Sequence, residues 1–193
     1  EALRQWINDT AAVDRESGTS PTLPGLRPLL TTPRDILGRA FVPSHETYAQ
    51  AVNATYAAMM HEFVGLHEKA FDCGLDLLIF PQGTRSIQLT RGRIGLAQVA
   101  LRYKKTVVPV GCSGSHLLYP GESPWAKPGR VVYRIGEPIP YGSVPDCSIS
   151  APFEPFTPEA EHAHREVFQR HVDHVMDRIN ELLDPEYQYG PDP

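Results

Sequence analysis

The sequence predicts an α/β fold in which a mixed, largely parallel sheet is flanked by helices. Two apolar runs, 75–80 and 106–110, have the length of buried strands. Around them, apolar residues recur at three- and four-residue steps in the segments 44–71, 95–103 and 157–182, which is typical of helices. Strands that alternate with helices indicate a sheet covered on both faces.

Local signals define the first elements. The short apolar run 40–42 predicts a strand that ends at Pro43. The next helix begins near Ser44, and Gly74 is its expected stop. The face of this helix that we expect to be buried contains Tyr48, Val52, Tyr56, Met59, Phe63 and Leu66.

The last elements are predicted in the same way. Residues 130–135 alternate as a strand does, with every second side chain apolar. Thr157 and Pro158 predict the start of the final helix, because a capping hydroxyl and a proline at the first helical position are common there. The helix should end at Asp184 and bury Phe168, Val172, Val175, Ile179 and Leu182.

The composition is that of a globular protein. A chain of 193 residues with 41% hydrophobic and 21% charged residues most often forms one domain. Residues 17–35 are rich in Ser, Thr, Pro and Gly, so we expect a loop region at 1–35 and a single α/β domain at 36–193. No stretch reaches the roughly 18 apolar residues that span a bilayer. Because the chain does not begin with Met, we expect the N-terminal part of the domain to precede residue 1.

Charge and cysteine usage indicate the setting. The net charge is −5, yet no acidic residue lies between Asp76 and Glu122. One basic patch on an acidic protein predicts an anionic ligand or an anionic membrane surface rather than nucleic acid, although a solvated helix face with local salt bridges is the alternative. Three scattered cysteines without metal spacing favour a reducing, cytosolic compartment. The basic residues of the patch are Arg85, Arg91, Arg93, Arg102, Lys104 and Lys105.

The turn 80–86, with the sequence FPQGTRS, directly follows the predicted strand 75–80. Ligands of α/β sheets bind beyond the carboxyl ends of strands, so a site is expected at this turn. Gly83 lets the backbone approach a ligand, and Arg85 offers a planar fork of donors for phosphate oxygens. The alternative is a tight turn whose arginine makes a structural ion pair. Further donors for the same anion come from Thr84, Ser86, Arg91 and Arg93.

The turn FPQGTRS resembles the FPEGTRS signature of the phospholipid-synthesis acyltransferases, the family of bacterial lysophosphatidate acyltransferase. The likeness covers residues 36–190, and the supporting elements occur in the family's order. They are the G-x-x-F-[IV] motif at 38–42, the Lys-x-Gly element at 93–95, the strand motif at 107–110, the GEPI segment at 136–139 and the family's ending at 183–190.

The resemblance implies the glycerolipid acyltransferase fold and an O-acyltransferase of phospholipid biosynthesis. Such an enzyme moves a fatty acyl group from acyl-CoA or acyl-carrier protein, its co-substrate, to the hydroxyl of a lysophospholipid or glycerol-phosphate-like acceptor. No cofactor or metal is expected, and the protein would be cytoplasmic and peripheral at the inner face of the membrane. Arg85 would hold the acceptor's phosphate. The substrate-binding residues would be Gln82, Gly83, Thr84, Arg85, Ser86, Arg91, Arg93, Phe41, Val108 and Pro109.

In this family a His-x4-Asp pair does the chemistry, because the His takes the hydroxyl proton and the Asp orients the ring. We leave the catalytic residues of this chain unassigned. The nearest local match places Asp9 where the His belongs and Asp14 as its partner, and a carboxylate with an ordinary pKa of about 4 is a poor base. His67 and Asp72 have the literal spacing, but residues five apart on a helix point in different directions.

The other histidines are weaker candidates. His45 and His116 follow predicted strand ends and could approach the site, although a surface position is the commoner one. On the final helix, a mostly solvated face is expected rather than a metal site. That face contains His162, His164, His171 and His174.

Three explanations of the absent histidine stay open. It precedes residue 1, or the protein is an inactive member that binds lipid or acyl-CoA, or the base is an unusual residue. Gln82 replaces the signature's Glu, and Ser44 or His45 stands where the family carries an Arg, so the acceptor could also differ. A generic nucleotide-phosphate module is disfavoured because neither a GxxxxGK[ST] nor a GxGxxG loop occurs.

Overall fold

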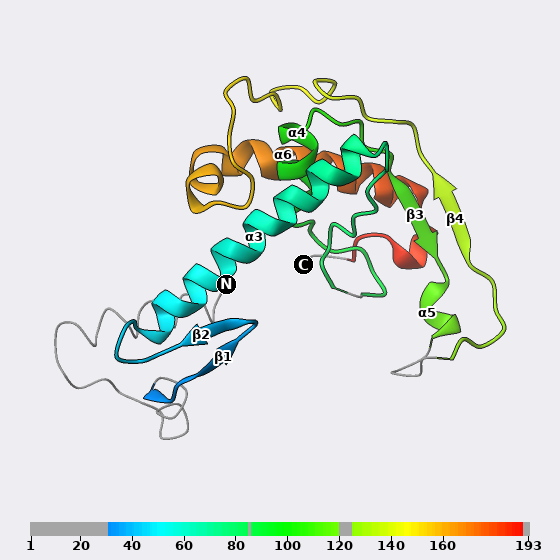
Figure 1. Ribbon diagram of the computed structural model, residues 1–193. Helices are drawn as coiled ribbons and strands as arrows, with labels where there is room; N and C mark the ends of the chain where they lie inside the picture. The colour runs from blue at the N-terminus through cyan, green and yellow to red at the C-terminus, as the bar shows by residue number, and fades with distance from the viewer. Residues whose placement is uncertain (1–30, 85, 120–124, 191–193) are drawn as a thin grey trace. The chain divides into compact units, whose positions relative to one another are not determined.

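The computed structural model describes residues 31–84, 86–119 and 125–190. The chain divides into two compact units, Glu1–Asp76 and Leu77–Pro193. This division falls within 36–193, whose unity as one domain stays a prediction. Both helices and strands occur, so the α/β class holds (Figure 1).

The described part of the first unit contains a β-hairpin. Strand β1 (Arg34–Ile36) pairs in antiparallel register with β2 (Arg39–Phe41). The turn residues Leu37 and Gly38 have positive φ values of 53° and 86°, a geometry whose twist matches that of the flanking strands. Phe41 is buried, and its ring lies edge-on to Tyr48 at 5.5 Å between centroids.

Helix α3 (Tyr48–Asp72) begins four residues after the predicted start near Ser44, because Thr47 is its N-cap. The Thr47 side chain accepts a hydrogen bond from the Gln50 N–H, and the Gln50 side chain accepts one from the Thr47 N–H, which together form a capping box. Cys73 is the C-cap, and Gly74 follows with a φ of 70°, a conformation that glycine adopts without strain. The predicted stop at Gly74 is therefore confirmed.

The predicted buried face of α3 is wrong. Its large apolar side chains at positions 56, 59, 63 and 66 are 40–61% exposed. The helix contacts both strands of the hairpin. Apolar residues occur around much of this helix, so periodicity alone did not define the inward stripe. The buried residues are Ala49, Ala51, Thr55, Val64 and His67.

The second unit contains a small antiparallel sheet and several helices. Strand β3 (Val110–Ser113) pairs antiparallel with β4 (Val132–Ile135), and Val107 bridges Ile139 beyond them. Both sheets among the described residues are two-stranded and antiparallel, so no largely parallel sheet is present in this part of the chain. The helices are α4 (Gly95–Arg102), α5 (Ser115–Leu118), α6 (Pro158–Leu182) and the 3-10 turn η1 (Pro185–Tyr187).

The predicted buried strand at 75–80 is not formed. This segment has no regular secondary structure and pairs with no described strand. Ile79 packs against the core, whereas Leu78 and Phe80 are 81% and 76% exposed. An apolar run supplies inward side chains but cannot supply the neighbouring strand that its backbone groups need. The strand predicted at 106–110 is also displaced, because β3 begins only at its last residue.

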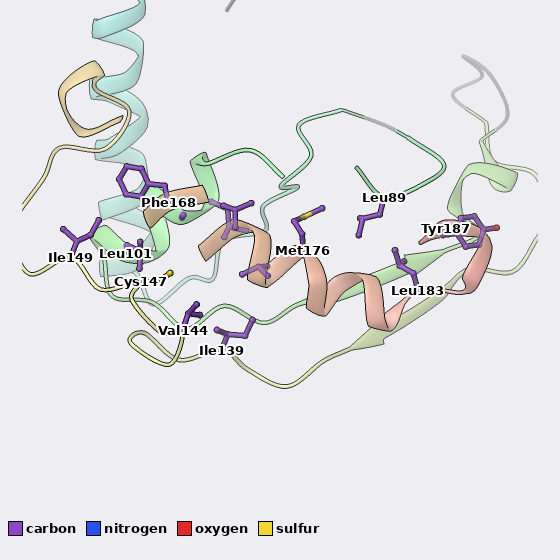
Figure 2. Close-up of a cluster of buried hydrophobic side chains, with 14 residues drawn as sticks. Leu89, Leu101, Ile139, Val144, Cys147, Ile149, Phe168, Met176, Leu183 and Tyr187 are labelled. Carbon is purple, nitrogen blue, oxygen red and sulfur yellow. The ribbon is translucent and has the colours of Figure 1, made fainter. Parts of the chain in front are cut away.

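Helix α6 builds the core of the second unit. It packs against α4 and β3, and its residues Phe168, Val172, Val175 and Met176 are at most 1% exposed. Figure 2 shows the buried cluster extended along α6, with Ile149 at one end and Tyr187 at the other. The predicted inward face is confirmed, as is the Thr157 cap, whose hydroxyl accepts the Ala160 N–H at 3.2 Å. In the described ranges, none of the helices is both long and apolar enough to cross a bilayer.

Three of the four histidines expected on a solvated face of α6 are buried or half-buried, namely His164, His171 and His174. His171 is 4% exposed, and its Nδ1 has no hydrogen-bond partner in the described part of the chain. Burial lowers the pKa of His171 to about 4, with a smaller contribution from His174. His164 is half-buried, with its ring 5.6 Å from that of Phe153 and 5.9 Å from that of Phe168.

We predict that the free energy of unfolding falls as the pH drops from about 6.5 to about 4 because of His171. In the unfolded chain this residue gains a proton at its ordinary pKa, whereas the folded protein keeps it neutral, so the unfolded state binds more protons in this window. The shift corresponds to about 3 kcal/mol. Urea unfolding at a series of pH values measures it. His171→Leu should remove most of the dependence, and the exposed control His162→Gln should retain it. Equal pH slopes in the wild type and His171→Leu would assign the effect to other groups.

Candidate anion-binding site

The predicted site begins at a tight turn, Pro81–Thr84. Gly83 has a φ of 69°, and its N–H donates a hydrogen bond to the Phe80 carbonyl at 3.1 Å. A residue with a Cβ would be strained in this conformation, which explains the glycine. Thr84 and Ser86 are exposed on either side of Arg85, and Arg85 itself lies outside the described residues.

A small polar network closes the loop that follows the turn. The Gln82 Nε2 donates to Ser86 Oγ at 2.8 Å and to Thr90 Oγ1 at 2.9 Å. Ser86 Oγ in turn donates to the Gln88 carbonyl at 2.6 Å. Gln82 therefore uses its amide nitrogen to hold the loop 82–90, while its Oε1 accepts no hydrogen bond from the residues that the structure describes. Gln88 and Thr90 were not among the predicted site residues, because neither belongs to the signature.

The basic segment 91–93 is fastened to both the turn and α6. The Arg93 N–H donates to the Pro81 carbonyl at 2.7 Å, which brings the predicted residue Arg93 to the turn. Gly92 is buried against α6, and a Cβ there would lie 2.3 Å from Val172 Cγ1. Gln169 adds a weaker hydrogen bond from Nε2 to the Gly92 carbonyl at 3.4 Å. The turn and the two arginines thus share one surface.

The two arginines of this segment differ in their surroundings. Arg91 Nε lies 3.9 Å from Asp173 Oδ1, a carboxylate that also accepts a hydrogen bond from Gln169. Arg93 is exposed, its Cγ lies near Gly83, and its guanidinium has no ion pair with any residue within 31–84, 86–119 or 125–190. Arg93 is therefore the described cation that is most available to an anion at the turn.

Acidic residues of α6 continue beside this surface. Burial, with smaller contributions from Asp177 and Asp173, raises the pKa of Tyr189 to about 12. The Tyr189 hydroxyl is uncharged at neutral pH, as an unperturbed phenol also is. Asp173 was missed by the sequence reasoning, because its contact with Arg91 joins residues that are far apart in the chain.

The other predicted substrate-binding residues belong to other elements of the chain. Phe41 belongs to the first unit, where it is buried beside Tyr48. Val108 is 48% exposed and lies just before β3, whose first residue Val110 pairs with Ile135. Pro109 is buried, and its carbonyl accepts the Gly136 N–H at 2.9 Å, so the 107–110 and 136–139 motifs are neighbours.

The candidate histidines are mostly committed to structural contacts. His67 is buried, its Nδ1 lies 2.7 Å from the Phe63 carbonyl, and its ring is edge-on to Phe63. His45 is exposed in the first unit. His116 is half-buried on α5 and lies edge-on to Tyr187 at 5.5 Å. Asp9 and Asp14 fall outside the described residues, and no cluster of three or more metal-ligating side chains occurs within them.

Comparisons of the chain with protein-family models, with curated proteins and with solved structures gave no match.

We predict that Arg93→Ala weakens the binding of glycerol 3-phosphate at least about tenfold, because charged hydrogen bonds to phosphate are worth roughly 1.5–3 kcal/mol. Arg91→Ala should have a smaller effect, since Asp173 already offsets its charge. Isothermal titration calorimetry at low salt measures both.

The matched control is Arg165→Ala, which removes an equal charge from an exposed, ion-paired position on α6. An Arg93→Ala affinity no lower than that of the control would remove Arg93 from the site.

Proposed function

We propose that the turn Pro81–Thr84, Arg85 and Arg93 hold the phosphate of the acceptor in an O-acyltransferase of glycerolipid-acyltransferase type. The hydrogen bond from Arg93 to Pro81 carries this proposal, because it joins the signature-like turn to the basic segment on one surface. The proposal retains the mixed, largely parallel sheet of the glycerolipid acyltransferase fold. The resemblance of FPQGTRS to the family signature supplies the reaction type.

In the proposed reaction, a hydroxyl oxygen of a lysophospholipid or glycerol-phosphate-like acceptor attacks the carbonyl carbon of an acyl thioester. A new C–O ester bond forms, and the C–S bond to CoA or acyl-carrier protein breaks. The hydroxyl proton passes to a general base, and the thiolate leaves and is protonated. The identity of the base is not assigned.

The described residues can bind and orient the acceptor. Arg93 offers planar donors that match phosphate oxygens, and Arg85, which lies outside the described residues, is proposed to add a second set. Gln82 is held by Ser86 and Thr90, so its Oε1 is fixed in direction and can accept a hydrogen bond from a glycerol hydroxyl. Because Gln82 is neutral where the signature has a carboxylate, it orients the hydroxyl without repelling the phosphate.

A lipid- or acyl-CoA-binding protein without transferase activity is the second candidate. The burial of His67 favours this candidate, because His67 is the histidine that has the family's literal spacing to an aspartate. That ring is buried, and its Nδ1 lies against a carbonyl of its own helix. In this case the same surface would bind the phosphate without consuming a thioester.

An assay of thiol release separates the two candidates. Acyl-CoA or acyl-carrier protein is supplied as the donor, with lysophosphatidate as the acceptor, and the ester product is detected by mass spectrometry. We predict turnover with an acceptor KM that Arg93→Ala raises about tenfold while the donor KM is unchanged. Phosphate binding without thiol release would support the second candidate. If the protein neither binds phosphate nor releases thiol, both candidate functions are wrong.

We also propose that the protein is cytoplasmic and associates peripherally with the inner face of the membrane. The structure divides the predicted basic patch into two groups, because α4 separates Arg93 from the residues after Arg102 by about 10 Å along its axis. Arg102 is half-buried with a shielded Nε, whereas Lys104 and Lys105 are exposed. Each lysine near an anionic leaflet contributes about 1 kcal/mol, so the association should be weak and reversible.

We predict salt-sensitive binding to vesicles that contain phosphatidylserine and little binding to phosphatidylcholine alone. Sedimentation at low and high salt measures it, because salt screens exposed charges. The double variant Lys104→Gln, Lys105→Gln should lose most of this binding, while the exposed control Lys127→Gln should retain it. Equal binding to both vesicle types would exclude these lysines as the membrane contact.

A further inference from the structure

The C-terminal segment Pro185–Gly190 is joined to the loop that follows the signature-like turn. The Leu89 N–H donates to the Tyr187 carbonyl at 2.9 Å, and both side chains are buried, at 8% and 9% exposure. Figure 2 shows Leu89 and Tyr187 at the same end of the buried cluster. The loop is therefore anchored in the core through a segment about 100 residues further along the chain.

A second contact lies at the end of this segment. A Cβ at Gly190 would be 2.9 Å from Gln88 Oε1, so the two residues approach closely. The Gln88 carbonyl accepts a hydrogen bond from Ser86, which itself accepts one from Gln82. Three successive contacts thus connect the C-terminal segment with the residue proposed to orient the acceptor hydroxyl.

Asn180 of α6 fixes the C-terminal segment. Its Oδ1 accepts the Tyr189 N–H at 2.9 Å, and its carbonyl accepts a hydrogen bond from Gln188 Nε2 at 3.2 Å. Gln188 Nε2 also donates to the Leu183 carbonyl at 3.2 Å. Helix α6 therefore contacts residues 91–93 directly. It supports the loop 82–90 indirectly, through the C-terminal segment that is hydrogen-bonded to Asn180.

We propose that Asn180 is a positioning residue for the anion-binding surface, acting through the C-terminal segment on the loop 82–90. Loss of its side chain frees Tyr189 and weakens the support of Gln88 and Leu89, so Gln82 and the turn lose their fixed orientation. The structural half of the proposal stands on the contacts above, whereas its effect on an acceptor rests on the proposed function.

Hydrogen exchange tests the structural half. In Asn180→Ala, the amides of 86–90 should exchange about fivefold faster, because a hydrogen bond of about 1 kcal/mol no longer opposes local opening. The amides of α4 should be unchanged, which separates a local effect from general destabilisation. Asn180→Asp retains an oxygen acceptor for the Tyr189 N–H and should restore the protection. Unchanged exchange at 86–90 in Asn180→Ala would overturn the proposal.

Binding of glycerol 3-phosphate tests the functional half. Asn180→Ala should raise the Kd about fivefold, roughly the share of a single orienting hydrogen bond. Faster exchange with an unchanged Kd would refute the positioning role. If the wild type binds neither glycerol 3-phosphate nor lysophosphatidate, the proposed function fails, and the exchange result still decides whether Asn180 positions the loop.

A deletion series guards against a variant that does not fold. Removal of residues 189–193 takes away Tyr189 and Gly190 but leaves Asn180 and the buried Tyr187 in place. It should reproduce the faster exchange at 86–90, and removal of 191–193 alone should not. Equal exchange in the two deletions would contradict the link between the segment and the loop.

Discussion

The close contact of α6 with two glycines is the constraint on which the second unit depends. At Gly92 a Cβ would lie 2.3 Å from Val172 Cγ1, and at Gly111 it would lie 2.7 Å from Leu182 Cβ. Neither distance leaves room for a side chain, and overpacking of a core typically costs about 1–3 kcal/mol. The two contacts lie ten residues apart on α6, so they fix how the helix lies against the basic segment and against β3. The position of the candidate site follows from the first of them.

Because α6 packs closely against the chain at Gly92 and Gly111, weak polar contacts are enough to hold the candidate site in one geometry. The hydrogen bonds of Gln82 are made at the surface, and each such bond contributes only about 0.5–1.5 kcal/mol net. Ordering a single loop residue costs a comparable amount of free energy. The network can therefore keep one geometry only because both ends of the loop are held, next to Pro81 by the Arg93 N–H and at Leu89 by the core. A loop held in this way keeps the Gln82 Oε1 pointing in one direction.

The electrostatic character of the site is set by pairs that are distant in the chain. The stretch between Asp76 and Glu122 contains basic residues and no acidic ones, which suggests a uniform positive patch. In the folded protein, Asp173 of α6 lies beside Arg91, while Arg93 stays exposed at the turn. Arg102 is drawn partly into the interior, with its Nε shielded. The number of basic residues in a segment therefore overstates the charge available to a ligand, because other elements neutralise or cover part of it.

The sequence by itself determined the elements whose signals are local. Thr157 with Pro158 fixed the start of α6, Gly74 fixed the end of α3, and the single apolar stripe of α6 identified its buried face, because caps and periodicity act within a few residues. It also identified the turn and Arg93 as parts of one candidate site. Only the tertiary structure decided which face of α3 is buried, that 75–80 forms no strand, and that Asp173, Tyr187 and Asn180 support the site. Burial, strand pairing and ion pairing are properties of two segments together, and a pattern within one segment does not specify its partner.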